Sequence, residues 1–200
     1  MLLRSCDVSS LVIDTLGAWV RGRNAAVACF YFDFVAQKEQ SPMVVLSSLL
    51  KQVVCGLEEI LVKIAQAFRD QRKVIGGLEV GLDEIVEMLR DISSSRPTFI
   101  CIDAVDECMV EYRMELLDSL EKVLYNSPCT RIFLAGRLQI RDEVEKHLAG
   151  MVMVIFVIPT NCDIIRFLRA KLKKDSTPDA MDKSLEADII KSIPETVSPM

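Results

Sequence analysis

Three carboxylates follow one short apolar run in this sequence. The run Thr98–Ile102 (TFICI) ends at Asp103, and a second acidic pair, Asp106 and Glu107, follows three residues later. If the run is a buried strand of a parallel sheet, Asp103 points into the crevice beyond the carboxyl ends of the strands, where such sheets bind ligands. A carboxylate there can hold Mg²⁺ directly or through water, and the pair beyond it can orient or deprotonate an attacking water.

The same residues have a simpler interpretation. Asp103 can merely end a strand, and Asp106 with Glu107 can cap the helix that follows, because acidic residues are common before helices. Spacing alone does not decide between a magnesium site and a helix cap.

A second segment, Arg131–Arg137 (RIFLAGR), has the form of a strand that leaves the sheet through Gly136 and ends at Arg137. In a parallel sheet Arg137 lies on the same edge as the three carboxylates. An arginine there can contact a γ-phosphate and report its presence. The alternative is an ordinary surface arginine, since motifs this short occur often by chance.

The surrounding sequence alternates short apolar runs with amphipathic stretches. The runs expected to be strands buried on both faces are Ala25–Phe34, Thr98–Ile102, Arg131–Ala135 and Val152–Ile158. Helical periodicity occurs in Ser9–Val20, Val44–Arg69, Leu82–Ile92, Glu111–Leu124, Arg141–Leu148, Cys162–Lys173 and Ser184–Ile193. Ser41 and Pro42 form a start signal for the second helix, Gly76-Gly77 marks a loop, and Pro194 ends the last helix. This alternation predicts an α/β fold with a parallel sheet between helices.

Composition excludes several classes of protein. The net charge of −5 and the pI near 5.1 argue against a nucleic-acid surface. The longest apolar runs are eight residues, far short of the roughly 20 needed to span a bilayer, and no stretch resembles a signal peptide. Seven scattered cysteines without C-x-x-C spacing, and His147 as the only histidine, argue against a disulfide scaffold or a zinc site. We expect a cytoplasmic protein without nucleic-acid or membrane partners.

Four segments together resemble the NACHT family of signal-transduction P-loop NTPases. The likeness is to its fungal branch, which includes heterokaryon-incompatibility proteins and nephrocystin-type N-terminal domains. The segments are YFDF at 31–34, FICIDAVDEC at 99–108, RIFLAGR at 131–137 followed by IRDEVE at 140–145, and DIIRFLRAKL at 163–172. The resemblance covers roughly residues 9 to 200. It implies an NTPase core at 9–174 and the start of the next helical segment at 175–200.

The resemblance also assigns roles. Asp103 would be the Walker B magnesium ligand, Asp106 and Glu107 the pair that positions water, and Arg137 the sensor arginine. Mg²⁺ and ATP are the cofactors of the intact family. Pro and His often follow the family's sensor arginine, but Leu138 and Gln139 stand here.

The start of the chain departs from the family pattern. Family members carry a strand and a G-x-x-x-x-G-K-[ST] loop just before the helix that corresponds to Ser9–Val20. Here Met1–Val8 contains neither glycine nor lysine, and Gly76 and Gly81 are followed by Leu82-Asp83. The resemblance therefore implies a truncated P-loop NTPase without its P-loop and its central first strand. Most phosphate-binding energy would then be missing.

These observations favour a fragment of a NACHT-type signalling ATPase, a nucleotide-dependent switch that keeps Walker B and the sensor arginine. We expect it neither to hydrolyse ATP by itself nor to bind Mg²⁺ and ATP tightly. An alternative is a nucleotide-independent interaction module that docks on full-length NACHT relatives, or on itself, through an exposed sheet edge. A third hypothesis, an enzyme with another nucleotide-binding mode, has no Ser-His-Asp, Cys-His or dinucleotide glycine pattern to support it.

Overall fold

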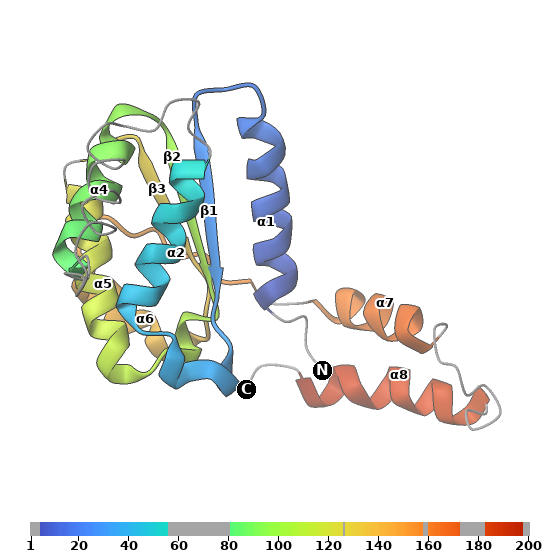
Figure 1. Ribbon diagram of the computed structural model, residues 1–200. Helices are drawn as coiled ribbons and strands as arrows, with labels where there is room; N and C mark the ends of the chain where they lie inside the picture. Colours follow the sequence, from blue (N-terminus) through green and yellow to red (C-terminus); the bar gives the residue numbers. More distant parts are fainter. Residues whose placement is uncertain (1–4, 56–80, 126, 158–159, 173–182, 198–200) are drawn as a thin grey trace. The chain divides into compact units, whose positions relative to one another are not determined.

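The computed structural model describes residues 5–55, 81–125, 127–157, 160–172 and 183–197 (Figure 1). The chain divides into two compact units, one spanning Arg4–Val152 and the other comprising Met1–Leu3 and Met153–Met200. Each unit is described by itself.

The first unit is built on a parallel sheet of three strands in the described residues. β1 (Ala26–Tyr31), β2 (Thr98–Asp103) and β3 (Thr130–Leu134) lie in the order β1-β2-β3. Cys101 of β2 is in register with Cys29 on one side and Phe133 on the other. All strands are parallel and separated by helices, so the predicted α/β class is confirmed. The predicted first strand was too long, because β1 ends at Tyr31.

Helices cover both faces of this sheet (Figure 1). α1 (Ser5–Val20) lies along one face, whereas α2 (Pro42–Cys55), α4 (Leu82–Ser95) and α5 (Val110–Tyr125) cover the other. Alternate residues of β2 serve the two faces, since side chains alternate along a strand. The Phe99 ring meets the Trp19 ring of α1 edge-on, with centroids 5.5 Å apart.

Ile100 and Ile102 of β2 belong to the main hydrophobic core. Both are completely buried, as are the leucines that α2, α4 and α5 contribute: Leu46, Leu49, Leu89, Leu116 and Leu120. Full burial of one such side chain contributes roughly 1.5–3 kcal/mol relative to exposure. This core therefore fixes the height and register of β2, whose last residue is Asp103.

Local signals place the helices that carry this core. Ser41 Oγ accepts a hydrogen bond from the backbone N–H of Val44 at 3.4 Å, and Pro42 occupies the first turn of α2, as predicted. Asp83 and Glu84 lie in the first turn of α4, where the helix dipole favours negative charge. The later part of the predicted helix Val44–Arg69 and the loop at Gly76-Gly77 lie outside the described residues.

Each strand leads into a 3-10 turn at its carboxyl end. The three turns are η1 (Phe34–Glu39), η2 (Val105–Glu107) and η3 (Leu138–Ile140). η3 continues into α6 (Arg141–His147). Two pairs hold α6 on α5: Arg113 Nε lies 2.9 Å from Glu143 Oε2, and His147 Nδ1 lies 2.7 Å from Asp118 Oδ1.

The prediction of a fourth strand at Val152–Ile158 is wrong for residues 152–157, the part of it that the structure describes. Residues 152–157 have no strand structure, and Met153, Ile155 and Val157 are between 64% and 81% exposed. An apolar run becomes a strand only where a neighbouring strand offers free N–H and C=O groups. In the described part of the chain no strand pairs with this segment.

The second unit contains α7 (Asn161–Leu172) and α8 (Lys183–Val197), which pack against each other. Thr160 and Asp163 cap α7 reciprocally: Thr160 Oγ donates to Asp163 Oδ2 at 2.6 Å, and the Asp163 N–H donates back to Thr160 Oγ1 at 3.3 Å. α8 continues through Pro194 to Val197, so the expected end at Pro194 is corrected. A proline in the last turn of a helix removes a single backbone hydrogen bond there.

None of the helices in the described ranges is long and apolar enough to cross a membrane. The expected boundary between residues 174 and 175 falls outside those ranges.

Candidate functional site

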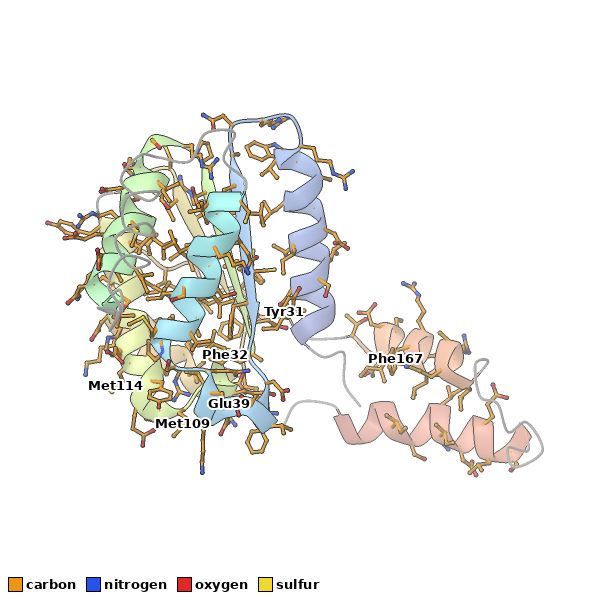
Figure 2. All side chains as sticks on the ribbon, in the orientation of Figure 1. Tyr31, Phe32, Glu39, Met109, Met114 and Phe167 are labelled. Carbon is orange, nitrogen blue, oxygen red and sulfur yellow. The ribbon has the colours of Figure 1, made fainter. Side chains whose placement is uncertain are left out.

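The predicted site residues all lie at one edge of the sheet. Because the three strands are parallel, their carboxyl ends meet there, and η1, η2 and η3 follow directly. Asp103 ends β2, Asp106 and Glu107 belong to η2, and Arg137 precedes η3. Figure 2 labels Tyr31 and Phe32 at this end of the sheet.

Asp103 is buried and bound to α1. Only 3% of its surface is exposed, and its Oδ1 accepts a hydrogen bond from Ser9 Oγ at 2.9 Å. Ser9 is itself 1% exposed. A buried carboxylate is costly without hydrogen-bond donors, so the Ser9 hydroxyl helps to make this position tolerable. Asp103 thereby fixes the amino-terminal half of α1 against the end of β2.

The chain turns sharply after Asp103. Ala104 has φ 54° and ψ 43°, the left-handed region that side-chain-bearing residues rarely adopt. Two backbone bonds hold this turn against the end of β3: Ala135 N–H donates to Ile102 O at 2.9 Å, and Val105 N–H donates to Ala135 O at 3.0 Å. The strained residue costs on the order of 1–2 kcal/mol, and these bonds stabilise the turn that aims η2 across the edge.

Asp106 binds the turn that follows β3. Its Oδ1 accepts the backbone N–H of Arg137 at 3.1 Å, and its Oδ2 lies 3.3 Å from Arg137 Nε. The Asp106 side chain is 10% exposed, whereas that of Arg137 is 72% exposed. Gly136 permits this approach, because a Cβ there would lie 2.8 Å from Ile140 Cδ1 and 3.2 Å from Asp106 Oδ1.

Glu107 binds in the opposite direction, to the turn that follows β1. Its Oε2 accepts the backbone N–H of Phe34 at 3.1 Å. Its backbone carbonyl accepts a hydrogen bond from Gln37 Nε2 at 2.7 Å. The neighbouring residues Asp106 and Glu107 therefore tie the turn after β2 to the turns on both sides of it.

The hydrogen bonds of the acidic side chains run to the turns on either side of η2. These hydrogen bonds run to Arg137 and Phe34 and not to the N–H groups of α5, so they are not the expected helix cap. Among the described residues, no group of three or more His, Cys, Asp or Glu side chains is arranged to hold a metal ion. Asp103, Asp106 and Glu107 share an edge but bind three different neighbours: α1, the β3 turn and the β1 turn.

Comparison with known protein families adds a second line of evidence. Residues 7–137 match the family described as Nephrocystin 3, N-terminal. This match covers more than half of the chain, including most of α1, the three strands and every candidate site residue. The chain belongs to this family. A search of curated proteins gives no match.

Two buried thiols flank the acidic residues in this nephrocystin 3 N-terminal domain. Burial, and to a smaller extent the negative charge that Cys29 would carry, raises the pKa of Cys101 to about 11. Burial also raises the pKa of Cys108 to about 11, against a lowering by Arg113 and with a smaller rise from Glu143. Thiolates are therefore disfavoured at neutral pH, and both cysteines behave as small packing residues.

Sequence reasoning missed the partners that hold the site of this family member together. Ser9 was predicted only to lie in a helix. A serine near the start of a helix can also donate its hydroxyl to a residue at the end of a strand, as Ser9 does to Asp103. Arg113 is 8% exposed, and its Nη1 donates to the Cys108 carbonyl at 3.0 Å while its Nε bonds Glu143. In the sequence, Arg113 is a positively charged residue in a helix with periodic apolar residues. This pattern does not reveal which residues it binds.

Proposed function

We propose that this domain is a NACHT-type signalling domain, of the fungal branch, that does not hydrolyse ATP by itself. The observation that carries the proposal is the link from Asp106 to Arg137, which joins the end of β2 to the end of β3. It occurs in a member of the nephrocystin 3 N-terminal family, at the edge where parallel α/β sheets bind ligands. In such a domain the acidic residues and the arginine would act together as parts of a conformational switch.

The residues of this edge do not fit a tight magnesium–ATP site. Mg²⁺ prefers near-octahedral oxygen coordination, and ATP binding relies on backbone N–H groups and a lysine around the phosphates. The printed sequence has no G-x-x-x-x-G-K-[ST] pattern. Asp106 and Glu107 already accept hydrogen bonds from Arg137 and Phe34.

The proposed role of the acidic pair is mechanical. Asp106 and Glu107 hold the turns after β1, β2 and β3 in one arrangement, and Asp103 adds α1 to it through Ser9. A partner or ligand that competes for Arg137, whose side chain is largely exposed, would loosen the β3 turn first. By the resemblance, Asp103 would be the Walker B magnesium ligand.

Phosphate release from Mg²⁺–ATP tests the proposal. The purified 200-residue chain and its Asp103→Asn variant would be assayed side by side, because the substitution keeps the shape but removes the charge. We expect both proteins to give the same background rate. Turnover by the unsubstituted chain that disappears in Asp103→Asn would overturn the proposal and assign Asp103 to a working catalytic site.

A further inference from the structure

β1 is an outer strand of the described sheet, where it pairs only with β2. The N–H groups of Ala26 and Phe32 both donate toward the β2 side, so the even-numbered residues of β1 face β2. Successive residues of a parallel strand turn their N–H and C=O groups to opposite sides. Three odd-numbered residues therefore turn these groups outward, and we call them the β1 edge: Val27, Cys29 and Tyr31.

An edge of this kind invites pairing with another chain, because its N–H and C=O groups are a template for a further strand. The sequence of β1, AVACFY, adds to this tendency, since it contains no charge, proline or glycine and includes valine, phenylalanine and tyrosine. Among the described residues, no other backbone group bonds the outward N–H or C=O of Val27 or Tyr31. Cys29, at the centre of the edge, is different.

The side-chain amide of Gln52 covers Cys29. Its Oε1 accepts the Cys29 N–H at 2.9 Å, and its Nε2 donates to the Cys29 carbonyl at 2.8 Å. A side-chain amide carries a carbonyl oxygen and N–H donors in one plane, as a peptide group does. Gln52 therefore makes the two hydrogen bonds that a neighbouring strand would make. No further strand can pair at Cys29 while Gln52 is in place.

Helix α2 holds the Gln52 side chain in this position. α2 runs beside β1 (Figure 1), and Leu49 and Val53, on either side of Gln52 in the sequence, are fully buried in the core. Gln52 Nε2 also donates to the Ser48 carbonyl at 3.3 Å, one turn earlier in the same helix. The amide is therefore aimed at the β1 edge by a helix that is itself anchored in the core.

We propose that Gln52 keeps the β1 edge closed to strand addition, and that the strand it excludes is β1 of a second copy of this chain. Cys29 is the middle residue of the edge. Two copies related by a twofold axis at this residue would pair antiparallel, with Cys29 opposite Cys29 and Val27 opposite Tyr31, and every outward group would gain a partner. β1 carries no charge that opposes this pairing. The inference does not rest on nucleotide binding.

Sedimentation analysis of the full chain over a wide concentration range, under reducing conditions, tests this proposal. Gln52→Met preserves an unbranched side chain of similar length but removes both hydrogen-bonding groups, so it uncovers Cys29. At high protein concentration this variant should have about twice the mass of the unsubstituted chain. Lys51→Met is the matched control, because it places the same residue at an exposed position of the same helix. Its mass should equal that of the unsubstituted chain.

A proline shows whether the association uses the β1 edge. Val27→Pro removes an N–H that faces away from β2, so the pairing between β1 and β2 keeps its hydrogen bonds. Gln52→Met/Val27→Pro should return to the mass of the unsubstituted chain. Trp19, which packs on Phe99 of β2, should keep the fluorescence of the folded domain.

Amide hydrogen exchange answers the same question without a proline, because it reports which amides of the edge are bonded. In the unsubstituted chain the Cys29 amide should exchange slowly, and the amides of Val27 and Tyr31 should exchange fast. In dilute Gln52→Met all three should exchange fast. At high concentration of this variant all three should exchange slowly.

Three results would overturn the inference. The first is a folded Gln52→Met variant with the mass of the unsubstituted chain at every concentration. The second is an association of Gln52→Met that leaves the Val27 and Tyr31 amides fast or persists in the folded proline variant. The third is a Cys29 amide that exchanges equally fast in the unsubstituted chain and in dilute Gln52→Met. Each of these leaves the ATP prediction untouched, so the two proposals fail separately.

Discussion

Asp106 and Arg137 bind each other, yet their removal should have unequal effects on stability. Asp106→Ala deletes the acceptor of the Arg137 backbone N–H and the partner of its guanidinium. Arg137→Ala deletes only the guanidinium, because the backbone N–H remains and still donates to Asp106. Asp106→Asn keeps an oxygen that can accept the N–H and loses only the charge.

The magnitudes follow from burial. An N–H left without its acceptor costs about 1–3 kcal/mol, and the Asp106 side chain is 10% exposed, so water replaces it poorly. The guanidinium is 72% exposed, and an ion pair with so exposed a partner contributes about 0–1 kcal/mol. We expect Asp106→Ala to lower the free energy of unfolding by about 2 kcal/mol. Arg137→Ala and Asp106→Asn should each lower it by about 1 kcal/mol or less.

Urea unfolding followed by Trp19 fluorescence measures these differences. Trp19 is the only tryptophan and packs on Phe99 of β2, so it reports the unit that contains the site. With an m-value of about 2 kcal/mol/M, Asp106→Ala should lower the urea midpoint by about 1 M, and the other two variants by about half of that or less. Equal losses of stability in Asp106→Ala and Arg137→Ala would contradict this expectation, since the loss would then come from the side-chain ion pair.

Two further predictions concern the same edge. Gly136→Ala should destabilise the domain by about 1–3 kcal/mol in the same urea assay, because the added Cβ would lie 2.8 Å from Ile140 Cδ1. Gly17→Ala in α1 is the control: Gly17 has open space around it, so this substitution should be neutral or stabilising. Burial raises the pKa of Cys101 and Cys108 to about 11, so the unfolded chain, with thiol pKa values near 9.0, loses these protons first. The free energy of unfolding should therefore fall as the pH rises from about 9 to about 11, and a Cys101→Ala/Cys108→Ala variant that falls as steeply would contradict this.

Hydrophobic pattern was sufficient to predict most elements of the first unit. β2 and β3 fall within one residue of their expected ends. β2 is largely buried, and a strand buried on both faces is apolar and changes composition sharply where it stops. β1 was overextended to Phe34 because apolar and aromatic residues continue past it. Those residues instead enter η1, where Asp33 Oδ1 accepts the Val35 N–H at 2.9 Å.

The segment 152–157 shows where pattern reasoning fails. Its composition is that of a strand, but strand structure requires a hydrogen-bonding neighbour that composition cannot supply. The prediction that Pro194 ends α8 was wrong for a related reason. Pro194 lies in the last turn of this helix, where a proline disrupts few hydrogen bonds, and the sequence does not show where that turn ends.

The edge position of Asp103, Asp106, Glu107 and Arg137 followed from strand order, but their partners did not. Ser9 lies 94 residues from Asp103 along the chain, and Arg137 lies 31 residues from Asp106. Contacts over such separations depend on the packing of α1 and on the left-handed turn at Ala104. Neither feature has a local sequence signal, so the roles suggested by the resemblance remain predictions.

Thermal unfolding with and without Mg²⁺–ATP shows whether this domain binds the nucleotide. A ligand that binds only the folded state at a hundred times its dissociation constant adds about 2.7 kcal/mol to the free energy of unfolding. We expect millimolar Mg²⁺–ATP to leave the unfolding midpoint of the unsubstituted chain unchanged, and to leave that of Asp103→Asn unchanged as well. A rise in midpoint that requires Mg²⁺ and is lost in Asp103→Asn would contradict it, because the edge of the sheet would then bind the nucleotide without a phosphate loop.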